Sequence, residues 1–98
     1  MLESEVERYL VRRAAEEGGE VRKVKWPGRN KAPDRVVMLW RWPRCRWAEL
    51  KKPGGLAAFP KNAHEEAQHR EHERMRKQGE VVVVIDSKAG VDALFSLD

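Results

Sequence analysis

Five consecutive apolar residues, Val-Val-Val-Val-Ile at positions 81–85, constrain the fold of this chain more than any other segment. The run lacks the alternation of a strand that faces water on one side, so it predicts a strand buried on both faces. Residues 63–78 contain neither glycine nor proline and end before Gly79, which predicts a helix. A helix that leads into a doubly buried strand is typical of a βαβ crossover, and residues 46–51 supply its first strand.

The remaining segments predict a helix at the N-terminus and two further strands. Apolar residues at positions 2, 6, 9, 10 and 14 have the spacing of an amphipathic helix, which the glycines at 18 and 19 end. Within that helix, Ser4 and Glu7 have the spacing of a capping box. Residues 20–26 and 35–40 predict strands, and the second should pair antiparallel with residues 46–51 through a turn near Pro43. Residues 52–62 predict an irregular basic loop and residues 89–95 a short terminal helix.

Length and composition narrow the classes of protein further. The 98 residues fit one domain, and 20 Lys and Arg against 16 Asp and Glu give a net charge of +4. This balance favours an anionic partner such as nucleic acid, although a solvated charged surface has the same totals. The single Cys45 excludes an intrachain disulfide and indicates a reducing compartment. No apolar run approaches the roughly 20 residues of a membrane span, and the acidic N-terminus is unlike an export signal, so we expect a cytoplasmic protein without membrane contact.

Two acids and a lysine near the paired strands form a candidate catalytic group. Glu49 and Lys51 are two residues apart on one strand and share a face, and a turn centred near Pro43 places Asp34 diagonally from Glu49, at roughly 7 to 8 Å between Cα atoms. Two such carboxylates suit a hard divalent cation, beside which a lysine can hold or deprotonate a water, or offset charge that grows on phosphorus. The alternative is a salt bridge between Glu49 and Lys51 or Lys52, with Asp34 capping a turn.

The order and spacing of these residues resemble a known nuclease signature. Pro33-Asp34, followed after a gap by Glu49-Leu50-Lys51, resembles the PD-(D/E)xK motif, and the predicted element order matches the αβββαβ core of the restriction-endonuclease-like nucleases. Further matches along the chain are similar to the VRR-NUC family: Glu3-Ser4 with Glu7 and Leu10, Gly18-Gly19, Pro27-Gly28-Arg29-Asn30, Pro53-Gly54, Gln68 ahead of His72-Glu73, and Gly79 before Val81. Ala32 departs from the pattern, because a glycine often precedes the Pro-Asp pair.

This resemblance implies an α/β fold in which residues 1–98 form a single VRR-NUC-type nuclease domain, with a mixed sheet flanked by helices and a short C-terminal helix. It implies a Mg²⁺- or Mn²⁺-dependent endonuclease related to Holliday-junction resolvases, of the stand-alone phage or bacterial kind. Such an enzyme hydrolyses phosphodiester bonds in branched or flapped DNA during repair, recombination or replication, leaving 5′-phosphate and 3′-hydroxyl ends. The competing hypothesis is a non-catalytic basic DNA-binding or assembly module with the same fold.

The resemblance also implies roles for individual residues. The metal ligands are Asp34, Glu49 and the carbonyl of Leu50, and Lys51 positions the attacking water. Glu7 matches the acid that the first helix contributes to such sites, although Glu3 lies one turn earlier on the same side and remains an alternative.

The helix at 63–78 adds a polar candidate. Gln68 shares a stripe with His64, Glu71, His72 and Met75, so it should face inward. Its amide either reaches the catalytic acids or a metal-bound water, or is an ordinary buried amide bonded to backbone. The histidines fail the HExxH spacing of a zinc site, so we expect exposed helix histidines that contact DNA phosphate at most.

Basic and aromatic residues gather in the first half of the chain. We expect DNA phosphate contacts from the loops, through Lys25, Arg29, Lys31, Arg35 and Lys52. All four tryptophans, at 26, 40, 42 and 47, fall in the same half. They indicate either a homodimer interface, which is the preferred interpretation, or stacking on bases. A two-fold dimer would set two active sites facing two strands of a branched DNA.

Overall fold

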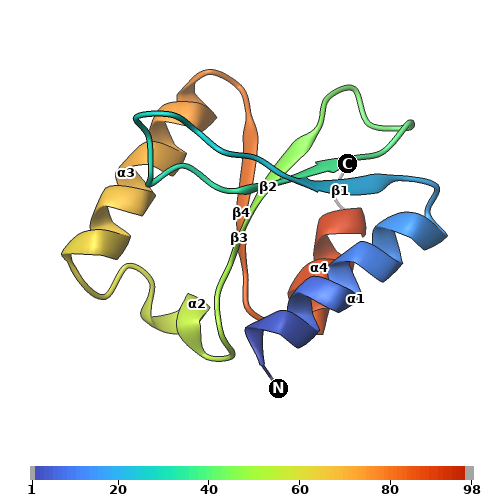
Figure 1. Ribbon diagram of the computed structural model, residues 1–98, viewed down its shortest axis with the longest axis horizontal. Coiled ribbons are helices and arrows are strands. Elements are labelled where there is room, and N and C mark those ends of the chain that lie inside the picture. Colours follow the sequence, from blue (N-terminus) through green and yellow to red (C-terminus); the bar gives the residue numbers. More distant parts are fainter. Residues whose placement is uncertain (1, 97–98) are drawn as a thin grey trace.

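The fold is built on a four-stranded sheet with helices on both of its faces (Figure 1). This computed structural model describes residues 2–96. The elements in chain order are α1 (Glu3–Glu16), β1 (Glu20–Lys23), β2 (Arg35–Met38), β3 (Arg46–Leu50), α2 (Gly55–Ala58), α3 (Ala63–Lys77), β4 (Val81–Ile85) and α4 (Lys88–Ser96). The strands lie in the order β1-β2-β3-β4, with β3 and β4 parallel and the other pairs antiparallel. The predicted α/β class, the mixed sheet and the βαβ unit are confirmed.

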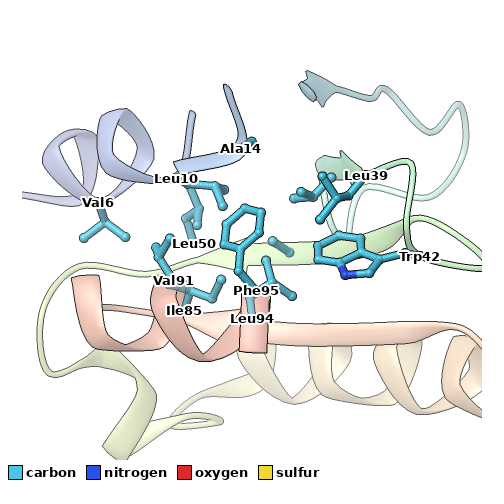
Figure 2. Close-up of a cluster of buried hydrophobic side chains, with 12 residues drawn as sticks. Val6, Leu10, Ala14, Leu39, Trp42, Leu50, Ile85, Val91, Leu94 and Phe95 are labelled. Carbon is cyan, nitrogen blue, oxygen red and sulfur yellow. The ribbon is translucent and has the colours of Figure 1, made fainter. Parts of the chain in front are cut away.

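The hydrophobic core lies between the sheet and the two terminal helices, α1 and α4 (Figure 2). Val6 and Leu10 of α1 are completely buried, as is Val91 of α4, and their apolar neighbours come from β2, β3 and β4. Asp92 ties the two helices together, because its Oδ1 accepts hydrogen bonds from Tyr9 Oη at 2.7 Å and Arg13 Nε at 3.0 Å. This half of the molecule therefore supplies most of the apolar burial that stabilises the fold.

Helix α3 covers the opposite face of the sheet (Figure 1), and its buried side is polar, unlike those of α1 and α4. Its buried residues are all polar: Glu65, Gln68, Glu71 and His72. Buried polar groups destabilise a fold unless they have partners, so four of them on one helix face point to a task other than packing. None of the helices within residues 2–96 has the length and apolar character needed to cross a membrane.

The register of β2 and β3 corrects the sequence prediction. Val36 pairs with Trp47 and Arg35 with Ala48, so the connection is symmetric about residues 41 and 42 rather than about Pro43. Continued by one residue, this register sets Asp34 directly opposite Glu49 instead of diagonal to it. The physical reason is that Trp42 is buried in the core and stacks on Phe95, with 5.6 Å between ring centroids. This contact fixes the centre of the connection one to two residues before Pro43.

One further local prediction is wrong, and another gains detail. The Ser4–Glu7 capping box does not form, because α1 begins after Leu2 and no side chain bonds its N-cap. The stretch 52–62 cannot stay regular for long, as its prolines and glycines predict, and its only regular element is the four-residue helix α2. In that stretch Asp86 Oδ2 accepts hydrogen bonds from the amides of Gly54 and Leu56, each at 3.1 Å, and so joins α2 to the end of β4.

Candidate active site

The alternation of β3 divides its side chains between the two helix layers. Ala48 and Leu50 belong to the core, whereas Glu49 and Lys51 meet residues of α3. Glu49 is buried, with Oε1 at 3.6 Å from Nε2 of His72. The predicted shared face of Glu49 and Lys51 therefore exists, and it lies beneath the polar side of α3.

The Lys51 ammonium is held by three side chains. Its Nζ donates a hydrogen bond to Gln68 Oε1 at 2.7 Å, lies 3.2 Å from Glu65 Oε2, and lies 5.3 Å from the centroid of the Phe59 ring. Gln68 is buried and faces inward, as its stripe predicts. Its partner is the lysine. The two sequence interpretations predict either the catalytic acids or a metal-bound water, or else only backbone.

Glu65 is an anion fixed at the start of α3. Asn62 caps this helix by accepting a hydrogen bond from the Glu65 amide at 2.9 Å, and Glu65 Oε1 accepts one from the Lys61 amide at 3.1 Å. Burial alone raises the pKa of the Glu65 carboxyl, but the hydrogen bonds from the Lys61 amide and the Lys51 ammonium outweigh burial and hold its pKa below the ordinary value. Both carboxylate oxygens are therefore engaged, and the charge opposite Lys51 is permanent at neutral pH.

Arg35 joins the two remaining predicted acids. Its Nη1 lies 2.9 Å from Asp34 Oδ1, and its Nε donates to Glu7 Oε2 at 2.5 Å. The Arg35 side chain is only 13% exposed, whereas that of Asp34 is 61% exposed. Glu7 thus approaches Asp34 through a shared guanidinium, from the α1 side of the sheet, while Lys51 and Gln68 lie on the α3 side. Glu3, the alternative helix-borne acid, is exposed.

A search of solved structures places this arrangement in a family. A structure described as a VRR_NUC domain superimposes with a TM-score of 0.74, covers 96% of this chain and 94% of that chain, and is 35% identical in sequence. The chain belongs to the VRR-NUC family. No family model and no curated protein matches the sequence. The VRR-NUC fold makes this a nuclease-type domain, in agreement with the motif carried by residues 33–51.

The basic residues predicted to contact DNA are distributed unevenly around this VRR-NUC domain. Lys25 and Lys52 are exposed. Arg29 forms an ion pair with Glu71 at 3.0 Å, and Lys31 Nζ lies 2.5 Å from Nδ1 of His64. A DNA contact by Arg35 would require it to leave Asp34 or Glu7 at least in part. The DNA-binding roles of all five residues stay predictions.

Histidine and tryptophan positions correct two expectations. His72 is completely buried rather than exposed, and neither of its ring nitrogens has a hydrogen-bond partner. Trp42 is a core residue, and the rings of Trp26 and Trp47 pack together at 5.1 Å. Trp26 and Trp47 are partly buried, and Trp40, at 82% exposure, is the one of the four that is largely exposed and best placed for an interface or a base.

The donor atoms of the VRR-NUC site fit a hard divalent cation. Asp34, Glu49 and the Leu50 carbonyl offer oxygen atoms, which Mg²⁺ and Mn²⁺ prefer over nitrogen or sulfur. Within residues 2–96, no three His, Cys, Asp or Glu side chains are grouped closely enough to hold a metal ion. The assignment of Asp34, Glu49 and the Leu50 carbonyl as metal ligands therefore stays a prediction.

Sequence reasoning missed Glu65 and the approach of His72 to Glu49. Glu65 precedes Gln68 by three positions, the same offset that selects Glu71 on the other side, so the helical stripe contained the signal. The stripe predicted from the sequence includes His64 instead, which is exposed. No spacing rule links His72 to Glu49, because that pairing depends on how α3 crosses the sheet.

Proposed function

We propose that this VRR-NUC protein is a Mg²⁺- or Mn²⁺-dependent endonuclease that hydrolyses phosphodiester bonds in branched or flapped DNA. The observation that carries the proposal is the common face of β2 and β3, where the register sets Asp34 opposite Glu49 and the alternation sets Lys51 beside it. Family membership supports the nuclease chemistry, and the net charge of +4 supports an anionic substrate.

The residues divide the work of hydrolysis. Asp34, Glu49 and the Leu50 carbonyl would hold the metal ion, which supplies Lewis-acid polarisation of a phosphoryl oxygen and lowers the pKa of a bound water. Lys51 donates its ammonium hydrogens to the water or to the phosphoryl oxygens on which negative charge grows. Gln68 and Glu65 keep this ammonium in place, so that it need not reorganise during the reaction.

Cleavage of a DNA panel tests the proposal. The parent protein is incubated with a four-way junction, a flap and a duplex of equal length, each with Mg²⁺, Mn²⁺ or EDTA. We expect cleavage of the branched substrates with metal only. Asp34→Asn, Glu49→Gln and Lys51→Met should each slow cleavage by about a hundredfold or more while DNA binding in EDTA is retained. Glu66→Gln, an exposed neighbour on α3, is the control for charge. A parent protein that cuts none of the substrates with either ion refutes the proposal.

A non-catalytic DNA-binding module is the second candidate. It is favoured by the ion pairs already present, because Asp34 is paired with Arg35 and Lys51 with Glu65. In this case the same substrates are bound in EDTA but remain uncut, and removal of Asp34 changes only stability and binding.

The proposal includes a homodimer, since two strands of a junction require two sites. The exposed indole of Trp40 is the candidate contact, with the partly exposed Met38 two residues earlier at the end of β2. Sedimentation of the parent and of Trp40→Ser tests this: a dimer that dissociates in the variant supports the interface, whereas a monomeric parent removes it.

A further inference from the structure

A basic cleft lies between α3 and the loop that leads into Asp34. Its volume is about 200 Å³. Figure 1 shows this loop extending from β1 across to α3. The lining residues are Gly28, Arg29, Asn30 and Lys31 from the loop, and Ala67, Arg70, Glu71 and Arg74 from α3. Four cations and a single acid thus surround a space suited to one small anionic group.

Glu71 organises this cleft. Its Oε1 accepts hydrogen bonds from Arg29 Nη1 at 3.0 Å and from Arg74 Nη1 at 2.9 Å, so one buried carboxylate holds two guanidinium groups side by side. Both arginines are largely exposed, and each keeps further N–H donors for a ligand. Arginines fixed in this way lose little side-chain entropy when they bind an anion.

The cleft keeps a positive excess after its internal pairs are counted. Glu71 can neutralise only one of its two arginines. Arg70 is exposed and, among residues 2–96, has no ion-pair partner. Guanidinium groups match the oxygens of a phosphate group in pairs, which makes phosphate the best-fitting anion.

The position of the cleft relates it to the candidate active site. Gln68 marks that site on α3 by its bond to Lys51. Glu71 and Arg74 follow by three and six residues, or about 4.5 and 9 Å along a helix axis. Neighbouring nucleotides of one strand rise about 3.4 Å each. For a strand that runs along α3, this offset corresponds to roughly one to three nucleotides between a phosphate in the cleft and the one at Lys51.

We propose that Arg29, Arg70, Arg74 and Glu71 form a phosphate clamp that holds one backbone phosphate of the DNA strand being cleaved. The proposal rests on the proposed nuclease function and deepens it, because it states where the strand runs. Arg70 and Arg74 bind the phosphate oxygens, Arg29 closes the cleft from the loop, and Glu71 positions two of these side chains without touching the DNA.

A methylphosphonate scan tests the clamp. Single backbone phosphates of the substrate are replaced one at a time by the neutral group, and binding in EDTA is measured for the parent and for the double variant Arg70→Ala/Arg74→Ala. Replacement at one position, one to three nucleotides from the cut, should lower the affinity of the parent about tenfold. The same replacement should lower the affinity of the double variant less than about twofold, because this variant already lacks the side chains that bind the phosphate. The salt dependence of binding should also weaken, by about 0.7 to 0.9 in slope for each phosphate that the variant no longer neutralises.

The control is Arg8→Ala/Arg12→Ala, which removes two cations from α1 on the other side of the sheet (Figure 1). It should keep the parent's response at the sensitive position. Equal decreases in affinity for the parent and for Arg70→Ala/Arg74→Ala at every position overturn the clamp. If the parent binds DNA but never cuts it, the nuclease proposal fails while the scan still shows whether a clamped phosphate exists.

Discussion

Glu65 and Lys51 form an ion pair of 3.2 Å that joins the first turn of α3 to the residue after β3. The second oxygen of Glu65 is held by the Lys61 amide, so the carboxylate cannot turn away without breaking a hydrogen bond. Gln68 bonds the same ammonium from the next turn of the helix. The place of Lys51 is therefore set by α3 as much as by the strand from which it extends.

Neutralising Glu65 should slow cleavage without weakening substrate binding. Glu65→Gln keeps the size and the acceptor oxygen but removes the charge that strengthens the interaction with the Lys51 ammonium. We expect kcat to fall by about tenfold or more and KM to change less than about twofold. Steady-state kinetics on the preferred substrate measure both. The exposed Glu66→Gln serves as control, and equal kcat values for the two variants would contradict the role of Glu65.

Removing Arg35 should destabilise the fold more than removing a surface arginine. Arg35 is largely buried between Glu7 and Asp34, so Arg35→Ala leaves two carboxylates without their partner and should lower the free energy of unfolding by about 1 to 3 kcal/mol. Arg22→Ala is the matched control, because its pair with Glu20 is 63% exposed on both sides and should contribute less than about 1 kcal/mol. Urea unfolding of both variants measures the two losses of stability. Similar unfolding midpoints would show that Arg35 stabilises the fold no more than a surface ion pair does.

Acid should weaken the link between α1 and α4. The hydrogen bond from Tyr9 and then that from Arg13 lower the pKa of Asp92 below its ordinary value of 3.8. A lowered pKa means that the folded state favours the charged form, so its stabilisation is complete above pH 3.8 and is lost as the pH falls through the lower folded value. The difference in Tm between the parent and Asp92→Asn should therefore be largest near neutral pH.

Thermal melts of the parent and Asp92→Asn, between about pH 2 and pH 7, give this difference directly. Tyr9→Phe removes one donor to the Asp92 carboxylate, so Asp92→Asn should have a smaller effect in the Tyr9→Phe background than in the parent. A Tm difference that stays constant down to the lowest pH would rule out Asp92 as the titrating group.

Shortening a side chain at the centre of the core should strongly destabilise the fold. Leu10 is completely buried against residues of the sheet and α4, so Leu10→Ala should lower the free energy of unfolding by about 2 to 5 kcal/mol. Val11, its neighbour in the helix, is 48% exposed, and Val11→Ala should change stability by less than about 0.5 kcal/mol. Chemical denaturation measures both. Similar decreases in stability would mean that α1 packs with a different face.

The elements that the sequence predicts well are those whose signal is local. Residues 81–85 are apolar throughout, and β4 lies between α3 and α4, with Val82 and Ile85 buried and the other three residues half-buried. The three- and four-residue spacing around Leu10 fixes the buried face of α1 without reference to any partner.

The features that sequence reasoning could not predict depend on interactions between distant segments. The β2–β3 register follows from the burial of Trp42 against Phe95, which lies 53 positions further along the chain. The pairing of Glu65 with Lys51 depends likewise on the crossing of α3 over β3. No local pattern encodes either, and the Pro43 turn signal, although real, does not mark the centre of the connection.

The sheet carries its apolar core on one side and its polar group beneath α3 on the other, and this has an evolutionary consequence. Apart from those at Glu7, which reaches the candidate site through Arg35, mutations on α1 and α4 act mainly on stability. Mutations on the buried side of α3 act mainly on the proposed activity. During evolution, stability and substrate specificity can therefore change largely through different residues of the chain.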